Sequence, residues 1–328
     1  MAIETTMRAL ADMTRLRIMR LLSAMELAVG ELAQVLGQSQ PRVSRHVAIL
    51  CDAGLAERHR EGSWVFLRAV VGKERGNPVG EAVARLLAIA EREDSEFANR
   101  CADDRRQLAS IRETREQGAA EYFARHADEW DELRQLHSAD DVVEDRLQAA
   151  LTGQPMGDML DIGTGSGRMA ELFAPHADHV VALDKSLDML RVARAKLQNL
   201  PADSVELVQG DFAALPFAAH RFDTVMLHQV LHFAQQPAAA MAEAARVTRP
   251  GGRIAIVDFA AHTREELRDR HAHIRLGFTD NAIAALMQEA GFTPAKPIAC
   301  DEGELTVKIW IGTREGRPTS TEIKRAAS

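Results

Sequence analysis

Residues 159–167 constrain the fold of this chain more than any other stretch. Their sequence, M-L-D-I-G-T-G-S-G, starts as a short apolar strand with Asp161 near its end, and a helix-compatible run follows from Arg168. Three glycines alternate with other residues between the two elements: Gly163, Gly165 and Gly167. A strand, a tight glycine turn and a helix N-terminus bring bare backbone close to a ligand. The stretch therefore predicts a ligand-binding turn in an α/β fold.

The acid in front of the glycines narrows the class of ligand. The glycine spacing is G-x-G-x-G, whereas dinucleotide-binding turns carry G-x-G-x-x-G. A carboxylate at Asp161 would repel a pyrophosphate, but it can pair with an ammonium group. The motif therefore favours a nucleoside that carries a cationic amino-acid group. A glycine turn of this kind can also be purely structural, so the segments that follow it matter.

Four further segments follow in the order expected for a parallel sheet. A second apolar strand over residues 179–183 ends at Asp184, and an acid about 20 residues beyond a glycine turn commonly binds ribose hydroxyls. A third strand over residues 205–208 leads to Asp211 and Phe212. Two more apolar runs predict a fourth and a fifth strand: residues 222–228 and 249–258.

Together these segments resemble the class I S-adenosylmethionine (SAM) dependent methyltransferases. The resemblance implies a Rossmann-like α/β domain over residues 151–313, whose seven-stranded sheet is closed by antiparallel strands at residues 295–300 and 305–312. It also implies that the ligand is SAM or its product S-adenosylhomocysteine (SAH). Asp161 and the glycine backbone would then hold the amino-acid part of the ligand, and Asp184 would hold the ribose.

The same resemblance implies further contacts to the ligand. Asp211 and Phe212 stand where the family places its adenine contacts. Residues 119–150 resemble the helical cap of this methyltransferase group, which would lay three aromatic side chains over the ligand: Tyr122, Phe123 and Trp130. Packing into the core is an equal alternative for each of these aromatics.

Several residues are candidates for the acceptor side of such a site. Methyl transfer depends mainly on in-line placement of the nucleophile, because the sulfonium is already a good leaving group. The sequence therefore cannot identify a catalytic base, and it offers only candidates: His228, His232, His271, His273 and Arg275. His228 and His232, four residues apart, could also bind a metal, but no third ligand is in view and we predict no metal site.

Composition limits the class of protein and the number of domains that this chain can form. The chain has 328 residues, of which 46% are hydrophobic and 27% charged, as in a globular protein with room for two domains. We expect a cytoplasmic protein, because the sequence shows no signal peptide or membrane span, and three scattered cysteines form no disulfide framework. The net charge is −8, yet residues 1–70 contain nine Arg against seven Asp or Glu. The N-terminal 70 residues are thus positively charged, whereas the rest of the chain is acidic.

Residues 1–71 predict a compact helical module that ends in a β-hairpin. A first helix is capped by Asp12 or Thr14, a second ends at Gly37, and a third begins after Ser39. On the third helix, an apolar stripe at i, i+4 and i+7 is predicted to be buried: Val43, Val47 and Leu50. Arg42 and Arg45 lie on the opposite face, flanked by Ser44 and His46. The hairpin has strands at residues 55–59 and 64–69 joined by residues 60–63, and it offers three more arginines to phosphates: Arg58, Arg60 and Arg68.

A helix-turn-helix with outward arginines and a hairpin wing is typical of DNA binding, although a solvated face is the alternative for any one arginine. The stretch resembles the ArsR family of winged-helix regulators, homodimers that place the third helix in the major groove of double-stranded DNA. The resemblance implies six contacts to an operator: Ser39, Gln40, Arg42, Ser44, Arg45 and His46. Metal-sensing members carry Cys-x-Cys where this chain has residues 26–31 without cysteine, so soft-metal sensing there is not expected.

The remaining segments connect and end the chain. Residues 72–118 predict one long helix or two shorter ones that link the domains and pair with a second copy, with a merely solvated linker as the alternative. Residues 314–328 are short and polar, and we expect a disordered tail.

Two functions fit this layout. In the first, the methyltransferase-fold domain binds SAM or SAH as an effector and controls DNA binding, a layout that resembles SAH-responsive ArsR-type regulators. In the second, the domain is an active methyltransferase for a small molecule, with a DNA-binding head that controls its own operon. The fusion favours the first, because a DNA-binding head gains a purpose when ligand occupancy is reported to it.

Overall fold

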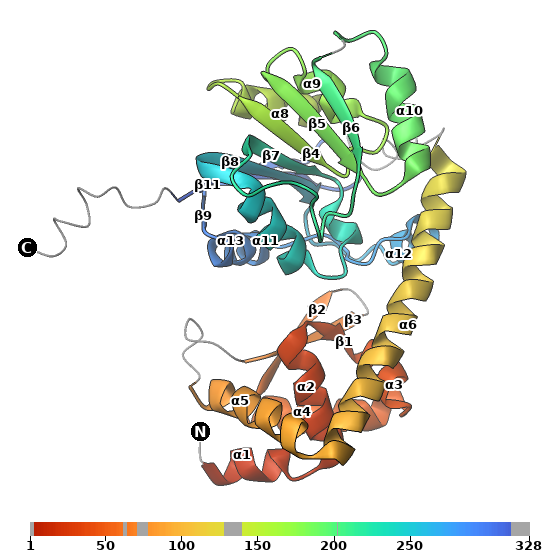
Figure 1. Cartoon of the computed structure of the whole chain (residues 1–328), viewed down its shortest axis with the longest axis vertical. Coiled ribbons are helices and arrows are strands. Elements are labelled where there is room, and N and C mark those ends of the chain that lie inside the picture. The colour runs from red at the N-terminus through yellow and green to blue at the C-terminus, as the bar shows by residue number, and fades with distance from the viewer. Residues whose placement is uncertain (1–2, 62–63, 71–77, 128–139, 202, 316–328) are drawn as a thin grey trace, which may run out of the picture. The chain divides into compact units, whose positions relative to one another are not determined.

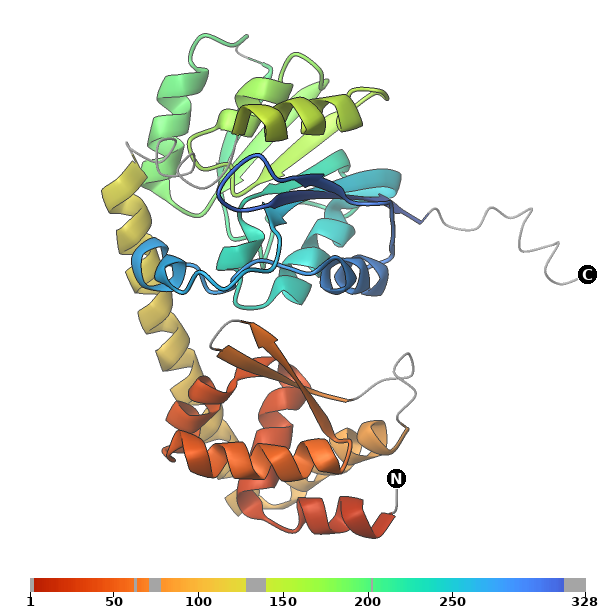
Figure 2. The same ribbon diagram turned by 180° about the vertical axis from the view of Figure 1, so that it is seen from behind.

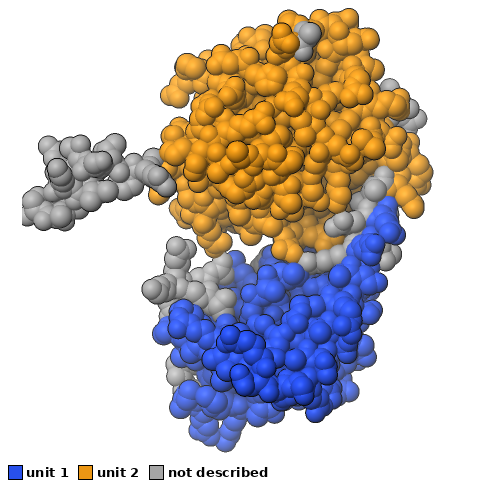
Figure 3. All heavy atoms as spheres, in the orientation of Figure 1, with its two compact units in different colours: residues 1–118 blue, residues 119–328 orange. Residues whose placement is uncertain are grey.

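The computed structural model describes residues 3–61, 64–70, 78–127, 140–201 and 203–315. Two compact units make up the chain, residues 1–118 and residues 119–328 (Figure 3). None of the helices in the described residues combines the length and apolar character that crossing a bilayer would require.

The first unit packs helices against a small antiparallel sheet. Its helices are α1 (Ile3–Leu10), α2 (Met13–Ala24), α3 (Val29–Leu36), α4 (Gln40–Asp52), α5 (Pro78–Glu93) and the N-terminal part of α6 (Ser95–His126) (Figure 1). Its strands, in the order β1-β3-β2, are β1 (Leu27–Ala28), β2 (Ala56–Glu61) and β3 (Trp64–Ala69). The predicted winged helix-turn-helix is confirmed. Strand β1 was not predicted, because two residues leave no periodic pattern.

Local signals place the helix ends of this unit. The Asp12 carboxylate accepts a hydrogen bond from the Arg15 N–H at 3.1 Å and caps α2, so Asp12 rather than Thr14 is the cap. Gly37 ends α3 in the left-handed conformation, with φ at 61°, which glycine adopts without strain. Ser39 is the N-cap residue of α4 by position, but its side chain makes no capping hydrogen bond.

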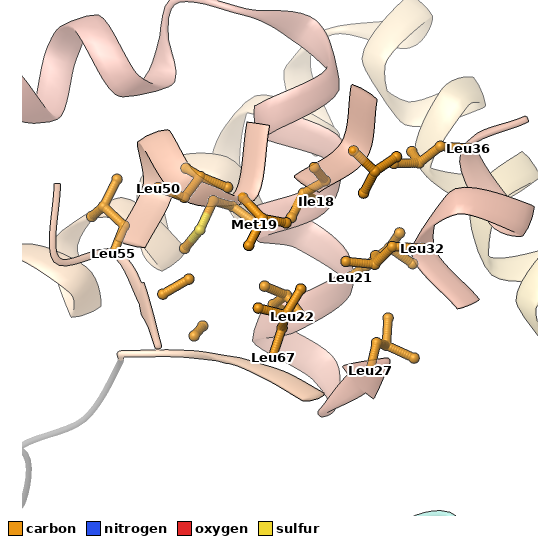
Figure 4. Close-up of a cluster of buried hydrophobic side chains, with 14 of the residues drawn as sticks. Ile18, Met19, Leu21, Leu22, Leu27, Leu32, Leu36, Leu50, Leu55 and Leu67 are labelled. Carbon is orange, nitrogen blue, oxygen red and sulfur yellow. The ribbon is translucent and has the colours of Figure 1, made fainter. Parts of the chain in front are cut away.

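One apolar core joins the elements of the first unit (Figure 4). The predicted stripe of α4 is buried in it, with Val43, Val47 and Leu50 no more than 2% exposed. Helices α5 and α6 add five side chains to the same core: Val83, Leu87, Phe97, Cys101 and Leu108. Arg17 of α2 also donates to the buried Asp104 of α6, with Nε and Oδ2 2.8 Å apart. A merely solvated linker is therefore wrong for α5 and the first half of α6.

The second unit is built on one mixed sheet. Its strands are β4 (Asp158–Ile162), β5 (His179–Asp184), β6 (Val205–Gln209), β7 (Phe222–His228), β8 (Thr248–Phe259), β9 (Phe292–Pro294), β10 (Ile298–Cys300) and β11 (Val307–Arg314). The order is β10-β11-β8-β7-β4-β5-β6, and β9 pairs with β11. Strands β4 to β8 pair in parallel, whereas β11 is antiparallel to β8. The predicted seven-stranded Rossmann-like sheet is confirmed, with β9 as a short addition.

Helices cover both faces of this sheet (Figures 1 and 2). One face packs against α8 (Asp140–Leu151), α9 (Arg168–Phe173), α10 (Leu187–Leu197) and α12 (Glu266–His271). The other packs against α11 (Pro237–Val247) and α13 (Asp280–Glu289). Burial on both faces explains why the central strands are continuous apolar runs. Polar residues are thereby confined to the strand ends, where ligands bind in open α/β sheets.

Candidate functional site

The glycine turn after β4 has a backbone that side chains would disturb. Gly163, Gly165 and Gly167 all have positive φ, at 71°, 56° and 84°. The N–H groups of Gly163 and Thr164 donate to the Leu183 carbonyl at 2.8 and 2.9 Å, which ties the turn to β5. A Cβ at Gly163 would lie 2.4 Å from Cγ2 of Val230. Only glycine therefore fits between the turn and the loop after β7.

Gly167 has a different role from the other two glycines. It is the N-cap residue of α9, and a Cβ there would lie 3.1 Å from the side chains of Ala193 and Leu197 on α10. It does not line the cavity described below. Gly167 thus lets α9 pack closely against α10, whereas Gly163 and Gly165 face the ligand space.

A cavity of about 580 Å³ opens at the carboxyl ends of β4, β5 and β7. This volume includes space that is open to solvent. Its walls come from β4 and the glycine turn, the end of β5, the end of β7 and the loop after it, and the helices α6, α9 and α10: Phe123, Asp161, Gly163, Thr164, Gly165, Ser166, Arg168, Met169, Asp184, Met189, His228, Gln229, Val230 and Phe233.

Two of the predicted acids lie in this cavity. Asp161 is 0% exposed, and its Oδ2 accepts a hydrogen bond from the Thr164 hydroxyl at 2.6 Å. Asp184 accepts from the N–H groups of Gly165 at 2.9 Å and Ser186 at 2.8 Å. Burial raises the pKa of Asp184 above its ordinary value, and the backbone hydrogen bonds oppose this rise. Both side chains are thus held in place before any ligand arrives.

The structure does not bring Asp211 and Phe212 into the same cavity lining. The Asp211 carboxylate accepts a hydrogen bond from the Ala213 N–H at 2.8 Å and pairs with the Lys185 ammonium at 3.0 Å. Burial raises the pKa of Asp211, but these two contacts outweigh burial and the net shift is downward. Phe212 packs against the core on the α11 face. Their contact with adenine stays a prediction.

The aromatic cap is divided between two environments. Phe123 lines the cavity, and its ring centroid lies 5.0 Å from that of Phe233. Tyr122 is outside the lining and only 8% exposed, with its hydroxyl 2.8 Å from Nδ1 of His271. Tyr122 is thus packed in the interior of the unit, as the alternative prediction had it, whereas Phe123 lines the cavity. Trp130 lies outside the described residues.

Among the histidine candidates, only His228 lines the cavity. His232 is 2% exposed; its Nδ1 lies 2.8 Å from Asp258 Oδ1, and its backbone N–H donates to Oδ2 at 3.1 Å. His273 stacks on His232, with ring centroids 4.1 Å apart. His232 thus anchors the loop after β7. Arg275 is also buried, and within the described residues no group of three or more His, Cys, Asp or Glu could hold a metal.

Several lining residues escaped the sequence reasoning. Gln229 and Val230 follow β7, and Gln229 has a positive φ of 50° with its N–H bonded to the Val257 carbonyl at 2.7 Å. Arg168 forms a two-point ion pair with Glu144 of α8, at 2.9 and 2.6 Å. The signal that could have located Gln229 is its position directly after a parallel strand, where ligand-binding loops occur.

The predicted DNA-binding face is largely exposed. Ser39, Gln40, Arg42, Ser44 and Arg45 on α4 are exposed, as is Arg58 on β2. His46 is only 15% exposed and lies 3.6 Å from Asp12, between Nδ1 and Oδ1. Arg68 pairs with Glu57 across the hairpin. The side chain of Arg60 lies outside the described residues.

Comparison with known proteins assigns a protein family to each of the two units. Residues 160–256 match the family described as methyltransferase domain, and residues 12–58 match the bacterial regulatory protein, arsR family. A demethylmenaquinone methyltransferase from Streptomyces griseus subsp. griseus is 34% identical over 173 residues, which cover 45% of this chain and 73% of that protein. One from Renibacterium salmoninarum is 31% identical over 152 residues, covering 46% of this chain and 59% of that protein.

The likeness to these proteins is partial in length. In three curated relatives the matched part is 59, 45 and 54% of their length, so the chain spans about half of each. The crystal structure of the N-methyltransferase NodS from Bradyrhizobium japonicum WM9, in complex with SAH, has a TM-score of 0.50 at 16% identity. That match covers 60% of this chain and 98% of NodS, and at this identity it shows the fold alone.

The fold and the matches define a two-domain protein, with an ArsR-type winged-helix domain at the N-terminus followed by a methyltransferase-fold domain. The chain belongs to the class I SAM-dependent methyltransferases, and its N-terminal unit is a DNA-binding domain of the bacterial ArsR family.

Proposed function

We propose that this protein is an ArsR-type transcriptional regulator whose methyltransferase-fold unit binds SAM or SAH as an effector. One observation carries the proposal: a single chain holds both a cavity lined by the glycine turn and two buried or half-buried acids, and a recognition helix with an exposed basic face. Differential affinity of the ligand for two DNA-binding states would couple the two sites.

The cavity suits an adenosyl amino acid by charge. The buried Asp161 carboxylate lines the cavity, where its negative charge would attract the ammonium group of the ligand, and the Gly163 and Gly165 backbone lets the ligand approach closely. Asp184 lies at the end of the neighbouring strand, where its carboxylate can accept from ribose hydroxyls. NodS, which shares this fold, was crystallised with SAH.

The DNA side rests on α4. In our proposal α4 enters the major groove with Arg42 and Arg45 directed to bases or phosphates, and Arg58 of the wing contacts the backbone. A homodimer would present two such helices to a two-fold operator. Exposed apolar side chains on α1 and α5 support a surface for a second copy: Ile3, Met7, Leu86 and Ile89, each 49 to 64% exposed.

An active small-molecule methyltransferase is the second candidate. Two observations favour it: His228 lines the cavity, and the relatives compared above are named as methyltransferases. A sensor and an enzyme need the same cavity, so the two functions are compatible. Transfer of labelled methyl groups from SAM to demethylated quinones and other small acceptors tests this candidate.

The regulator is tested by titrating SAM and SAH against DNA affinity. The DNA probe is a duplex that the protein selects from a random pool, with and without SAH. We expect at least one ligand to change the DNA affinity about 5-fold or more. Unchanged affinity with both ligands, when calorimetry shows that they bind, would refute effector control.

A further inference from the structure

Helix α6 contains residues of both compact units. It is one helix of 32 residues, drawn in yellow in Figure 1, and the boundary between the units falls within it, after Gly118. Its first half is part of the first unit's core, where Phe97, Cys101 and Leu108 are 2 to 4% exposed. Asp104 adds the buried ion pair with Arg17.

The last two turns of α6 form part of the ligand cavity. Phe123 is a wall residue and packs edge-to-face on Phe233, which lines the same cavity. The neighbouring Tyr122 hydroxyl bonds to His271 at the end of α12. His126 Nδ1 lies 2.8 Å from the Tyr122 carbonyl, which closes the final turn. The end of α6 is therefore packed within the second unit, against Phe233 and His271.

The middle of α6 has no large apolar side chain with which to pack against another element. Residues 112–120 read R-E-T-R-E-Q-G-A-A, with no large apolar side chain and with a glycine. Glycine lowers helix propensity, and tertiary packing of an apolar face usually supplies most of a helix's stability. Order in this stretch therefore depends on the two packed ends, because helix formation is cooperative along the chain.

We propose that α6 is the element that reports occupancy of the cavity to the DNA-binding unit, with Phe123 as the residue that senses the ligand. A ligand that fills the cavity contacts Phe123, because Phe123 is part of the wall. A ligand that stabilises or displaces the last turns of α6 changes how fully residues 112–120 are helical, because helix formation is cooperative. The change then reaches the N-terminal half of α6, which packs in the core of the first unit. This inference rests on the proposed function and names its regulatory element.

A proline substitution in the middle of α6 tests this inference, because it interrupts the helix between its two packed ends. Gln117 is exposed and helical, and proline there removes a helical hydrogen bond and clashes with the preceding turn. Gln117→Ala is the matched control, because alanine keeps the helix. The readout is the ratio of DNA affinities with and without SAH, measured beside SAH affinity and DNA affinity alone. We expect a ratio of about 5-fold or more for wild type and Gln117→Ala, and a ratio near 1 for Gln117→Pro.

Hydrogen exchange in the unmodified full-length protein gives a second test that needs no variant. SAH should change the exchange of α6 amides on both sides of Gly118, including residues 104–112 in the first unit. A change confined to residues 119–126 would overturn the inference, and this holds even if Gln117→Pro does not fold.

The outcomes separate this inference from the proposed function. A wild-type ratio of 1 despite bound SAH removes the regulator itself. A normal wild-type ratio that Gln117→Pro retains leaves the regulator intact and removes only the role of α6. Loss of the ratio in Gln117→Pro, with each separate affinity kept within about two-fold, supports both.

Discussion

At the scale of single residues, the site depends on two positions that tolerate few alternatives. Gly163 lies against Val230, and Asp184 accepts two backbone hydrogen bonds beside the cavity. One is constrained by shape and backbone conformation, and the other by charge and hydrogen bonding.

Gly163→Ala should destabilise the second unit. A Cβ would lie 2.4 Å from Val230, at a φ of +71° that alanine adopts poorly, and we expect a loss of about 1–3 kcal/mol in the free energy of unfolding. Urea unfolding measures it. Gly30→Ala is the control, because nothing lies within 4 Å of a Cβ there. Equal effects of the two substitutions would contradict the close approach of turn and loop.

Asp184→Ala should abolish most of the affinity for SAH. A hydrogen bond to a charged group contributes about 1.5–3 kcal/mol, so we expect at least a tenfold loss by calorimetry, while DNA affinity without ligand is unchanged. Asp188→Ala is the control, since Asp188 is exposed in the first turn of α10 and does not line the cavity. Retained SAH affinity in Asp184→Ala would refute the ribose assignment.

His262 should make stability depend on pH. Burial, and next the electrostatic effect of the neighbouring His232, lower the pKa of His262 to about 4 from an ordinary 6.5. Arg264 and Arg268 act in the same direction, and Asp258 opposes them. Between pH 6.5 and 4 the unfolded chain binds a proton that the folded protein does not, so stability falls as pH falls through this window. Urea midpoints at pH 7 and 5 should differ less in His262→Gln than in wild type. An equal difference would count against His262.

At the scale of elements, α4 is organised by its two faces. The apolar stripe is buried in the core, which fixes the rotation of α4 about its own axis. Arg42 and Arg45, on the opposite face, are therefore exposed to solvent. A helix fixed in this way presents the same side chains to any partner. The wing is less uniform, because Arg68 already pairs with Glu57.

Arg45→Ala should weaken DNA binding and its salt dependence together. Each interaction removed between a basic side chain and a phosphate lowers the slope of log affinity against log salt by about 0.9. The proposed homodimer loses one such interaction per protomer, so we expect the slope to fall by about two units. Fluorescence anisotropy over a range of salt concentrations measures both. Arg100→Ala, an exposed change on α6, should alter neither quantity. A wild-type slope in Arg45→Ala would show that Arg45 does not meet a phosphate.

At the scale of the whole molecule, the proposed homodimer should depend on the exposed apolar side chains of α5. Ile89→Glu places a charge where a second copy would bury an apolar side chain, so we expect a shift to monomer by light scattering and weaker DNA binding. Leu187→Glu is the control, because Leu187 is also exposed, at 64%, but lies on α10 of the second unit. A dimer that survives Ile89→Glu would place the interface elsewhere.

Much of the fold was predictable because its determinants are local. The end of α3 at Gly37, the stripe on α4, the glycine turn and the succession of five strands along the chain all follow from residues close together in sequence. The positions of Asp161 and Asp184 beside the glycine turn were predictable for the same reason, since Asp161 is the last residue but one of β4 and Asp184 is the last residue of β5.

Other features were settled only by tertiary structure. Whether α5 and α6 pack or remain solvated depended on buried partners such as Arg17 and Asp104, 87 residues apart. The division of roles between Phe123 and Tyr122, or between His228 and His232, depended on which loop each side chain meets, and no periodic pattern encodes that. By itself the sequence determined the elements and the class of ligand turn, because both are short-range. Only the folded chain decided which side chains share a cavity, because a cavity is formed by residues distant in sequence.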